Sequence, residues 1–142
     1  MKAQTIIVIL FIPLFAIANC SNDDPPLTEF PYEDPTDMTW CISLHNDQDG
    51  HVYTGIAKML ILSEHTLRFT YNIPGRRVEV RAARNQGNEN VSYEGFDIDR
   101  KDHMGILITM KNKYHLEGII YSADMNNQGD VELFASDPQN CK

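Results

Sequence analysis

The densest basic stretch of the chain is a set of four arginines, Arg76, Arg77, Arg81 and Arg84. Guanidinium groups bind phosphates and carboxylates through paired N–H donors, so this set could contact nucleic acid or an acidic partner. Alternation along the same segment places Arg77 and Arg81 on one face of a strand together with Glu79. The interpretation we favour is a solvated strand face.

Motifs for metal binding and nucleophilic catalysis are missing from the sequence. Residues 47–50 and 124–130 have the composition of calcium loops but lack the terminal bidentate Glu, so we predict turns there. There is no glycine-rich phosphate loop and no Gly-x-Ser-x-Gly elbow. We therefore expect no metal ion and no cofactor. None of the histidines stands in His-x-x-x-His spacing; they are His45, His51, His65, His103 and His115.

Residues 1–20 have the form of a targeting segment. Lys2 precedes an apolar run from Ile6 to Ala18, which is too short to span a bilayer. Two kinds of processing are compatible with this segment: cleavage by a signal peptidase after Ala18 or Cys20, or lipidation of Cys20 as in bacterial lipoproteins. We favour a signal peptide and secretion, and we expect no membrane span in the mature chain.

Cleavage after Cys20, or its lipidation, leaves two cysteines, Cys41 and Cys141, as a pair in an oxidising compartment. We predict a disulfide between them that brackets almost the whole mature domain; the alternative is two unpaired thiols.

Residues 21–37 read as an acidic, proline-rich extended arm. They contain four prolines, six acidic residues and no basic residue, so they offer little apolar surface for burial. We expect deletion of the arm to leave folding unchanged. The net charge of the whole chain is −8, but outside the arm the domain at 38–142 is only mildly acidic, which disfavours nucleic acid without excluding it.

The domain at 38–142 has the pattern of one helix followed by antiparallel strands. In residues 51–65, Val52, Ile56, Met59 and Leu60 have helical spacing, although residues 59–62 could also form a buried strand. In later segments apolar and polar residues alternate with a period of two, and we expect a turn at Pro74-Gly75. The strands that we predict are 38–44, 66–72, 76–84, 92–98, 105–110, 116–122 and 131–135.

The segment Tyr93-Glu94-Gly95-Phe96-Asp97 resembles the Tyr-Glu-Gly-Phe-Asp segment of the fungal guanyl-specific ribonucleases, whose loop grips guanine. Trp40-Cys41 is similar to the family's aromatic opening before a cysteine that bonds to one near the C-terminus. Residues 116–120 and Val131-Glu132 resemble its last two strands. The resemblance extends over about residues 38–141. It implies an α+β fold with one α-helix packed on an antiparallel β-sheet.

The catalytic set of that family is not found. The general acid His would fall at Ser122, the segment around the expected base offers only Asp102, and residues 105–110 contain no Arg. Acid–base catalysis and transition-state stabilisation each require such groups. The chain therefore resembles the RNase-like secreted effectors of powdery mildew fungi, which keep the ribonuclease fold without its activity. This resemblance implies a monomeric non-enzyme, delivered into a host cell, that binds host proteins and is detected by plant immune receptors.

A degenerate base-binding loop would consist of Asn90, Tyr93 and Glu94. Tyr93 could stack on a purine and Glu94 could accept from the base, giving weak RNA binding, but we favour side chains that only pack. Asn90-Val91-Ser92 is also an N-glycosylation sequon, relevant only in a eukaryote. Two other functions stay open: a bacterial surface lipoprotein with a small β-rich domain, and an active secreted ribonuclease with an atypical site formed by His103 and Glu94.

Overall fold

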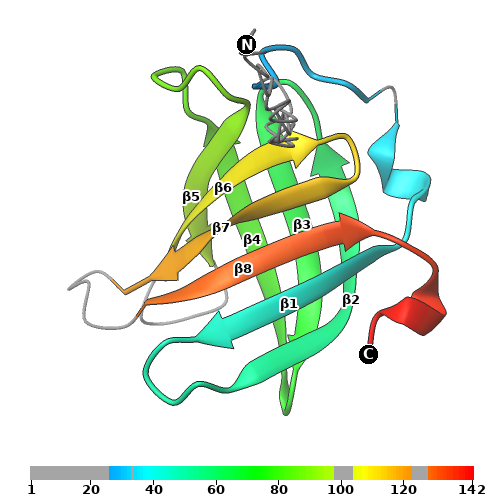
Figure 1. Ribbon diagram of the computed structural model, residues 1–142, viewed down its shortest axis with the longest axis vertical. Coiled ribbons are helices and arrows are strands. Elements are labelled where there is room, and N and C mark those ends of the chain that lie inside the picture. Colours follow the sequence, from blue (N-terminus) through cyan, green and yellow to red (C-terminus); the bar gives the residue numbers. More distant parts are fainter. Residues whose placement is uncertain (1–25, 33, 98–103, 123–127) are drawn as a thin grey trace, which may run out of the picture.

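The computed structural model describes residues 26–32, 34–97, 104–122 and 128–142, which form a closed barrel of eight antiparallel strands (Figure 1). Each strand pairs with the next in sequence, and pairing of β1 with β8 closes the barrel. The expected signal peptide at 1–20 and Cys20 lie outside the described residues. The elements are η1 (Pro35–Asp37), β1 (Trp40–Asn46), β2 (Val52–Leu62), β3 (Thr66–Ile73), β4 (Arg76–Arg84), β5 (Ser92–Asp97), β6 (Gly105–Asn112), β7 (His115–Tyr121), β8 (Gln128–Ala135) and η2 (Pro138–Asn140).

The α+β prediction is wrong, because this part of the chain contains strands and two short 3-10 helices but no α-helix. The ribonuclease-like architecture inferred from the resemblance is therefore absent. Within the described ranges, no helix is both long and apolar enough to cross a membrane.

The predicted helix at 51–65 is strand β2. Its buried side chains are Ala57, Met59 and Leu62, and its register with β3 shifts between Met59 and Ile61. Such a bulge inserts one residue and moves the inward positions from odd to even numbers. The buried residues are therefore separated first by two and then by three positions, which imitates the spacing of a helix.

The alternation predicted for the later strands is confirmed in β4. Val78 and Val80 are buried while Arg77 and Arg81 are exposed. The expected turn joins β3 to β4, and Gly75 adopts a φ of +79°, a left-handed conformation that glycine reaches without steric cost.

One half of the barrel interior is filled by large side chains. Trp40 and Phe69, together with Leu67 and Tyr93, have no exposed surface. They belong to β1, β3 and β5, and all project from the inner face towards the end where β1 begins. This end of the barrel is therefore a packed core.

The described residues before β1, 26–32 and 34–39, cover this packed end, and we call them the N-terminal segment (Figure 1). Leu27, Phe30 and Tyr32 pack against the core, and the Val91 N–H donates to the Leu27 carbonyl at 3.0 Å. In η1, the Asp34 side chain caps the first turn and Pro35 is buried. Much of the segment that we expected to extend into solvent therefore lies on the domain.

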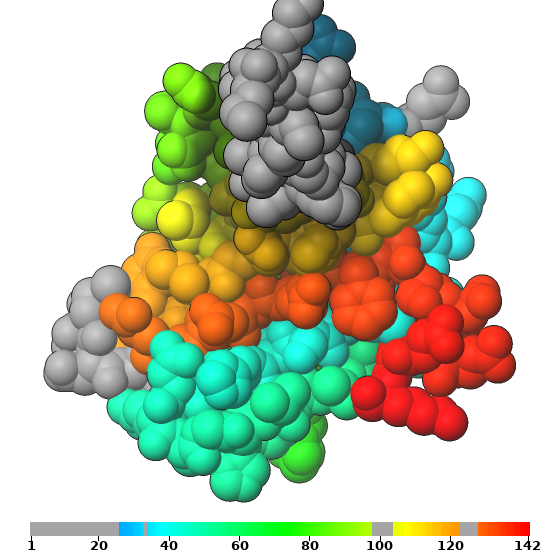
Figure 2. Space-filling view, viewed as in Figure 1, coloured from blue at the N-terminus to red at the C-terminus, as the bar shows by residue number. Residues whose placement is uncertain are grey.

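The predicted disulfide between Cys41 and Cys141 is present, with the two Cα atoms 4.8 Å apart. Cys41 alternates with the inward-facing Trp40 and Ile42, so its side chain leaves the outer face of β1. Residues 136–142 follow β8 and lie beside its end (Figure 2). Cys141 thereby reaches Cys41 on the outer face of β1. The bridge fastens the last residues of the chain to the strand that closes the barrel.

Candidate functional site

The barrel is hollow at the end opposite to the N-terminal cover. A cavity of about 300 Å³ lies where β1, β3, β5 and β7 finish and where the intervening strands begin. The cavity is open to solvent on one side.

Apolar side chains form the deep part of the cavity. Val80 on β4 and Ile106 on β6 are buried, as is Met104 just before β6. Leu44 and Ile120 add half-buried aliphatic surface. These residues would offer van der Waals contacts, but no hydrogen bonds from their side chains, to a molecule in the cavity.

An arginine and an aspartate bring charge into the wall. Arg76 begins β4 and Asp97 ends β5, and Arg76 Nη2 lies 3.4 Å from Asp97 Oδ2. The Asp97 residue is only 6% exposed, whereas the Arg76 side chain is about one third exposed. The Nε atom of Arg76 is buried and has no hydrogen-bond partner among the described residues. We call these two residues the Arg76–Asp97 pair.

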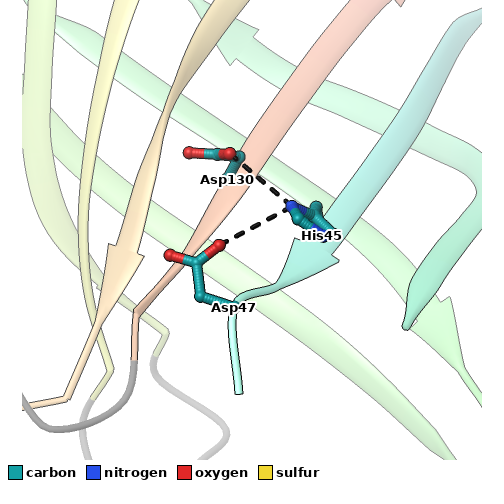
Figure 3. Close-up of side chains that lie close together, drawn as sticks. All are labelled: His45, Asp47 and Asp130. Carbon is teal, nitrogen blue, oxygen red and sulfur yellow. Dashed lines mark ion pairs between the residues drawn. The ribbon is translucent and has the colours of Figure 1, made fainter. Parts of the chain in front are cut away.

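Tyrosine, histidine and acidic side chains lie at the mouth. Tyr53 is exposed there, and His45 pairs with Asp130 across β1 and β8. His45 Nδ1 lies 3.6 Å from Asp47 and 3.7 Å from Asp130, and Figure 3 marks both ion pairs with dashed lines. We call His45, Asp47 and Asp130 the acidic rim. Its donor atoms are of the types that bind divalent transition metals, and they lie within 4.8 Å of one another, but all three residues are exposed.

The predicted base-binding residues do not form one site. Tyr93 is fully buried, and its hydroxyl donates to the Ser63 carbonyl at 2.8 Å. Burial also raises the pKa of this phenol. Glu94 projects from the opposite, outer face, where Tyr121 OH and Asn85 Nδ2 lie 3.5 Å from its carboxylate. Tyr93 therefore has no free face on which a base could stack.

Asn90 lies just before β5 at the packed end and is half-buried. The sequon hydroxyl of Ser92 is fully buried and accepts from Asn88 Nδ2 at 2.7 Å. Asn90 is therefore far along the barrel from the cavity, and a glycan on it would not border the mouth.

The four arginines of the predicted basic patch are also separated. Arg77 and Arg81 share the outer face of β4, where Arg81 Nε donates to Glu79 at 3.0 Å. Arg76 lies at the cavity, whereas Arg84 lies at the packed end, with its Nη2 3.4 Å from the Thr28 carbonyl. The solvated face with Glu79 is thus seen for two of the four, and no common phosphate-binding surface is formed.

One sequence signal indicates the cavity and is absent from the predictions above. In β4, Arg76 shares the parity of Val78 and Val80, which places it on the inner face at the strand's first position. The acidic rim had no such signal, because His45 and Asp130 meet only through the pairing that closes the barrel.

No protein-family model matches the sequence, and no match was found among curated proteins. Among solved structures the chain is similar to a redesigned beta barrel, with 13% identity and a TM-score of 0.50. The alignment covers 72% of this chain and 92% of the redesigned barrel. At this identity the likeness shows the barrel fold alone.

Proposed function

We propose that this protein is a secreted, non-catalytic binding protein that holds one small, largely apolar molecule in the open end of its barrel. The observation that carries the proposal is the cavity of about 300 Å³ in a barrel whose other half is fully packed. Ligand sites are typically concave and mostly apolar, with a few polar groups that orient the ligand, and about 300 Å³ is the lower end of their usual size.

The composition of the wall supports binding of an apolar molecule. Water against Val80, Met104 and Ile106 finds no side-chain partner, so a ligand that displaces it gains free energy from the removal of apolar surface from water. We call these three residues the apolar floor, and Tyr53 and Tyr71 add aromatic surface beside it. The ligand would therefore enter with its apolar part towards the packed core.

Secretion is supported by two independent features. The apolar run at 6–18 has the length of a signal peptide's apolar core, and the Cys41–Cys141 bridge is of a kind that persists in oxidising compartments. Because the bridge does not use Cys20, the lipoprotein alternative stays compatible with the same binding site. Analysis of the mature N-terminus by mass spectrometry would distinguish a cleaved chain from one lipidated at Cys20.

The proposed host-directed role has a different basis. It came with the ribonuclease resemblance, and the fold implied by that resemblance is absent, so action on a host protein or an immune receptor stays a prediction without structural support. Binding of a small molecule does not depend on that resemblance.

The test uses the mature chain and an uncharged fluorescent probe, 1-aminoanthracene. We expect saturable fluorescence enhancement with one site per chain. The variant Ile120→Trp, which would fill the cavity from β7, should weaken binding by at least tenfold. Ile119→Trp is the matched control, because its side chain leaves the outer face of the same strand and does not line the cavity. Absence of probe binding, or equal binding by the Ile120→Trp variant, would contradict the proposal.

A further inference from the structure

We propose that the cavity selects uncharged ligands that carry one hydrogen-bond acceptor on a hydrocarbon skeleton, such as a ketone, and that Arg76 binds this acceptor. This inference rests on the proposed function, because it assumes that a small molecule enters the cavity. It concerns the chemistry that the Arg76–Asp97 pair and the acidic rim impose on that molecule.

Arg76 has N–H donors that are not satisfied by the described residues. Its guanidinium carries five N–H groups, and its hydrogen bond within the described residues runs from Nη2 to Asp97 at the long distance of 3.4 Å. Since Nε is buried without a partner among the described residues, the group is under-satisfied as a whole. The side chain lines the cavity and is about one third exposed, so an acceptor on a bound molecule can reach its terminal nitrogens.

The charges around the cavity disfavour an anionic ligand. Among the described residues that line it, Arg76 is the only cationic arginine or lysine, whereas Asp97 and Asp130 are both acidic. Asp97 already faces Arg76, and Asp47 lies beside Asp130 on the acidic rim (Figure 3). A ligand carboxylate at Arg76 would therefore share one guanidinium with a nearly buried carboxylate, and like charges in such a site repel.

A cationic ligand gains little from the same groups. Near the apolar floor it would meet the guanidinium of Arg76, which repels it. At the mouth, Asp130 is 69% exposed and lies beside His45, so solvent screens its attraction. Among the described residues of the wall, Asp97 is therefore paired with Arg76, and Asp130 is screened by solvent.

A pure hydrocarbon would fit the floor but would leave Arg76 as it is. If it displaced water from the guanidinium, the polar group would lose hydrogen bonds without replacement. A neutral carbonyl satisfies the donor and adds no charge. Of the four ligand classes, the neutral acceptor is therefore the one that both the apolar floor and the charged wall accept.

The test compares four ligands of one chain length, namely nonane, nonan-2-one, nonanoate and nonylamine, by displacement of bound 1-aminoanthracene. We expect nonan-2-one to bind at least tenfold more tightly than each of the other three. Arg76→Met should weaken the binding of nonan-2-one by about tenfold, the lower end of what one hydrogen bond to a charged group contributes. It should leave the affinity for nonane unchanged. Arg77→Met is the matched control, because that side chain is exposed on the outer face. It should change neither affinity.

A second measurement does not depend on a variant that may fold poorly. The carbonyl stretch of isotope-labelled nonan-2-one should move to lower frequency in the complex than in hexane, because a guanidinium donor weakens the C=O bond. An unshifted band, or equal or tighter binding of nonane, nonanoate or nonylamine, would overturn this inference while the proposed function stood. Failure of 1-aminoanthracene itself to bind would instead remove the proposed function.

Discussion

The indole Nε1 of Trp40 donates a hydrogen bond of 3.1 Å to the carbonyl oxygen of Pro35, and the Trp40 side chain is fully buried. Trp40 is the first residue of β1, and Pro35 begins η1 in a segment rich in prolines and acids. Phe30 and Tyr32 extend this contact, with the Tyr32 ring 6.1 Å from that of Trp40. The N-terminal segment therefore covers the packed end of the barrel and packs against its core.

Deletion of residues 21–36 should therefore destabilise the domain, contrary to the expectation from composition. The deletion exposes the Trp40 indole and removes its acceptor, together with the apolar contacts of Leu27, Phe30 and Tyr32. We expect the melting temperature to fall by more than about 5 °C, which corresponds to roughly 1 kcal/mol for a domain of this size. Calorimetry of the deletion and of the full mature chain measures this, and equal melting temperatures would show that the cover contributes nothing.

Tyr93 in the core and Tyr32 in the N-terminal segment should respond differently to loss of their hydroxyl groups. Tyr93 OH donates to the Ser63 carbonyl, so Tyr93→Phe should lower the free energy of unfolding by about 1 kcal/mol. Tyr32 OH is buried and has no partner among the described residues, so Tyr32→Phe should be neutral or stabilising. Urea unfolding of both variants makes the comparison, and a larger loss for Tyr32→Phe would contradict it.

Stability should fall in alkaline solution because burial raises the pKa of both Tyr32 and Tyr93. Phenols of the unfolded chain lose their protons near pH 10, whereas the folded protein retains these two to a higher pH. Above about pH 10 the unfolded state therefore binds fewer protons, and the free energy of unfolding decreases as pH rises. Unfolding by urea at several pH values from 8 to 11.5 tests this. The double variant Tyr32→Phe/Tyr93→Phe should show a shallower decline, and an identical decline would refute the assignment.

The strands after residue 66 were predictable because their inner faces keep one parity over six to nine residues, as Val78 and Val80 do in β4. The bulge in β2 broke that parity between Met59 and Ile61, and local periodicity then favoured a helix. Closure was not predictable from local pattern, because β1 and β8 pair through residues such as Ile42 and Leu133, about ninety positions apart. The same non-local pairing creates the acidic rim.

The five-residue motif gave the wrong fold for a physical reason. The motif alternates between buried and exposed residues, as any strand buried on one face does: Tyr93 and Asp97 point inward, and Glu94 and Phe96 point outward. Such a pattern does not specify a ribonuclease loop. What it does specify is packing: Tyr93 fills the core, and Asp97 joins Arg76 at the cavity.

Gly95, at the centre of that motif, should tolerate no side chain. A Cβ at this position would overlap the carbonyl oxygen of Arg81 and the Cα of Ala82, which belong to the backbone of the paired strand β4 and cannot rotate away. Forcing a methyl group into such a contact typically costs about 1–3 kcal/mol, so Gly95→Ala should lower the free energy of unfolding by at least that amount. Gly55→Ala on β2 is the matched control, because a Cβ there meets no atom within 4 Å, and this change should be neutral or stabilise the protein by up to about 1 kcal/mol. Urea unfolding of the two variants decides the matter. Equal stability of Gly95→Ala and the unchanged protein would mean that β4 and β5 do not approach as closely at this point as the barrel requires.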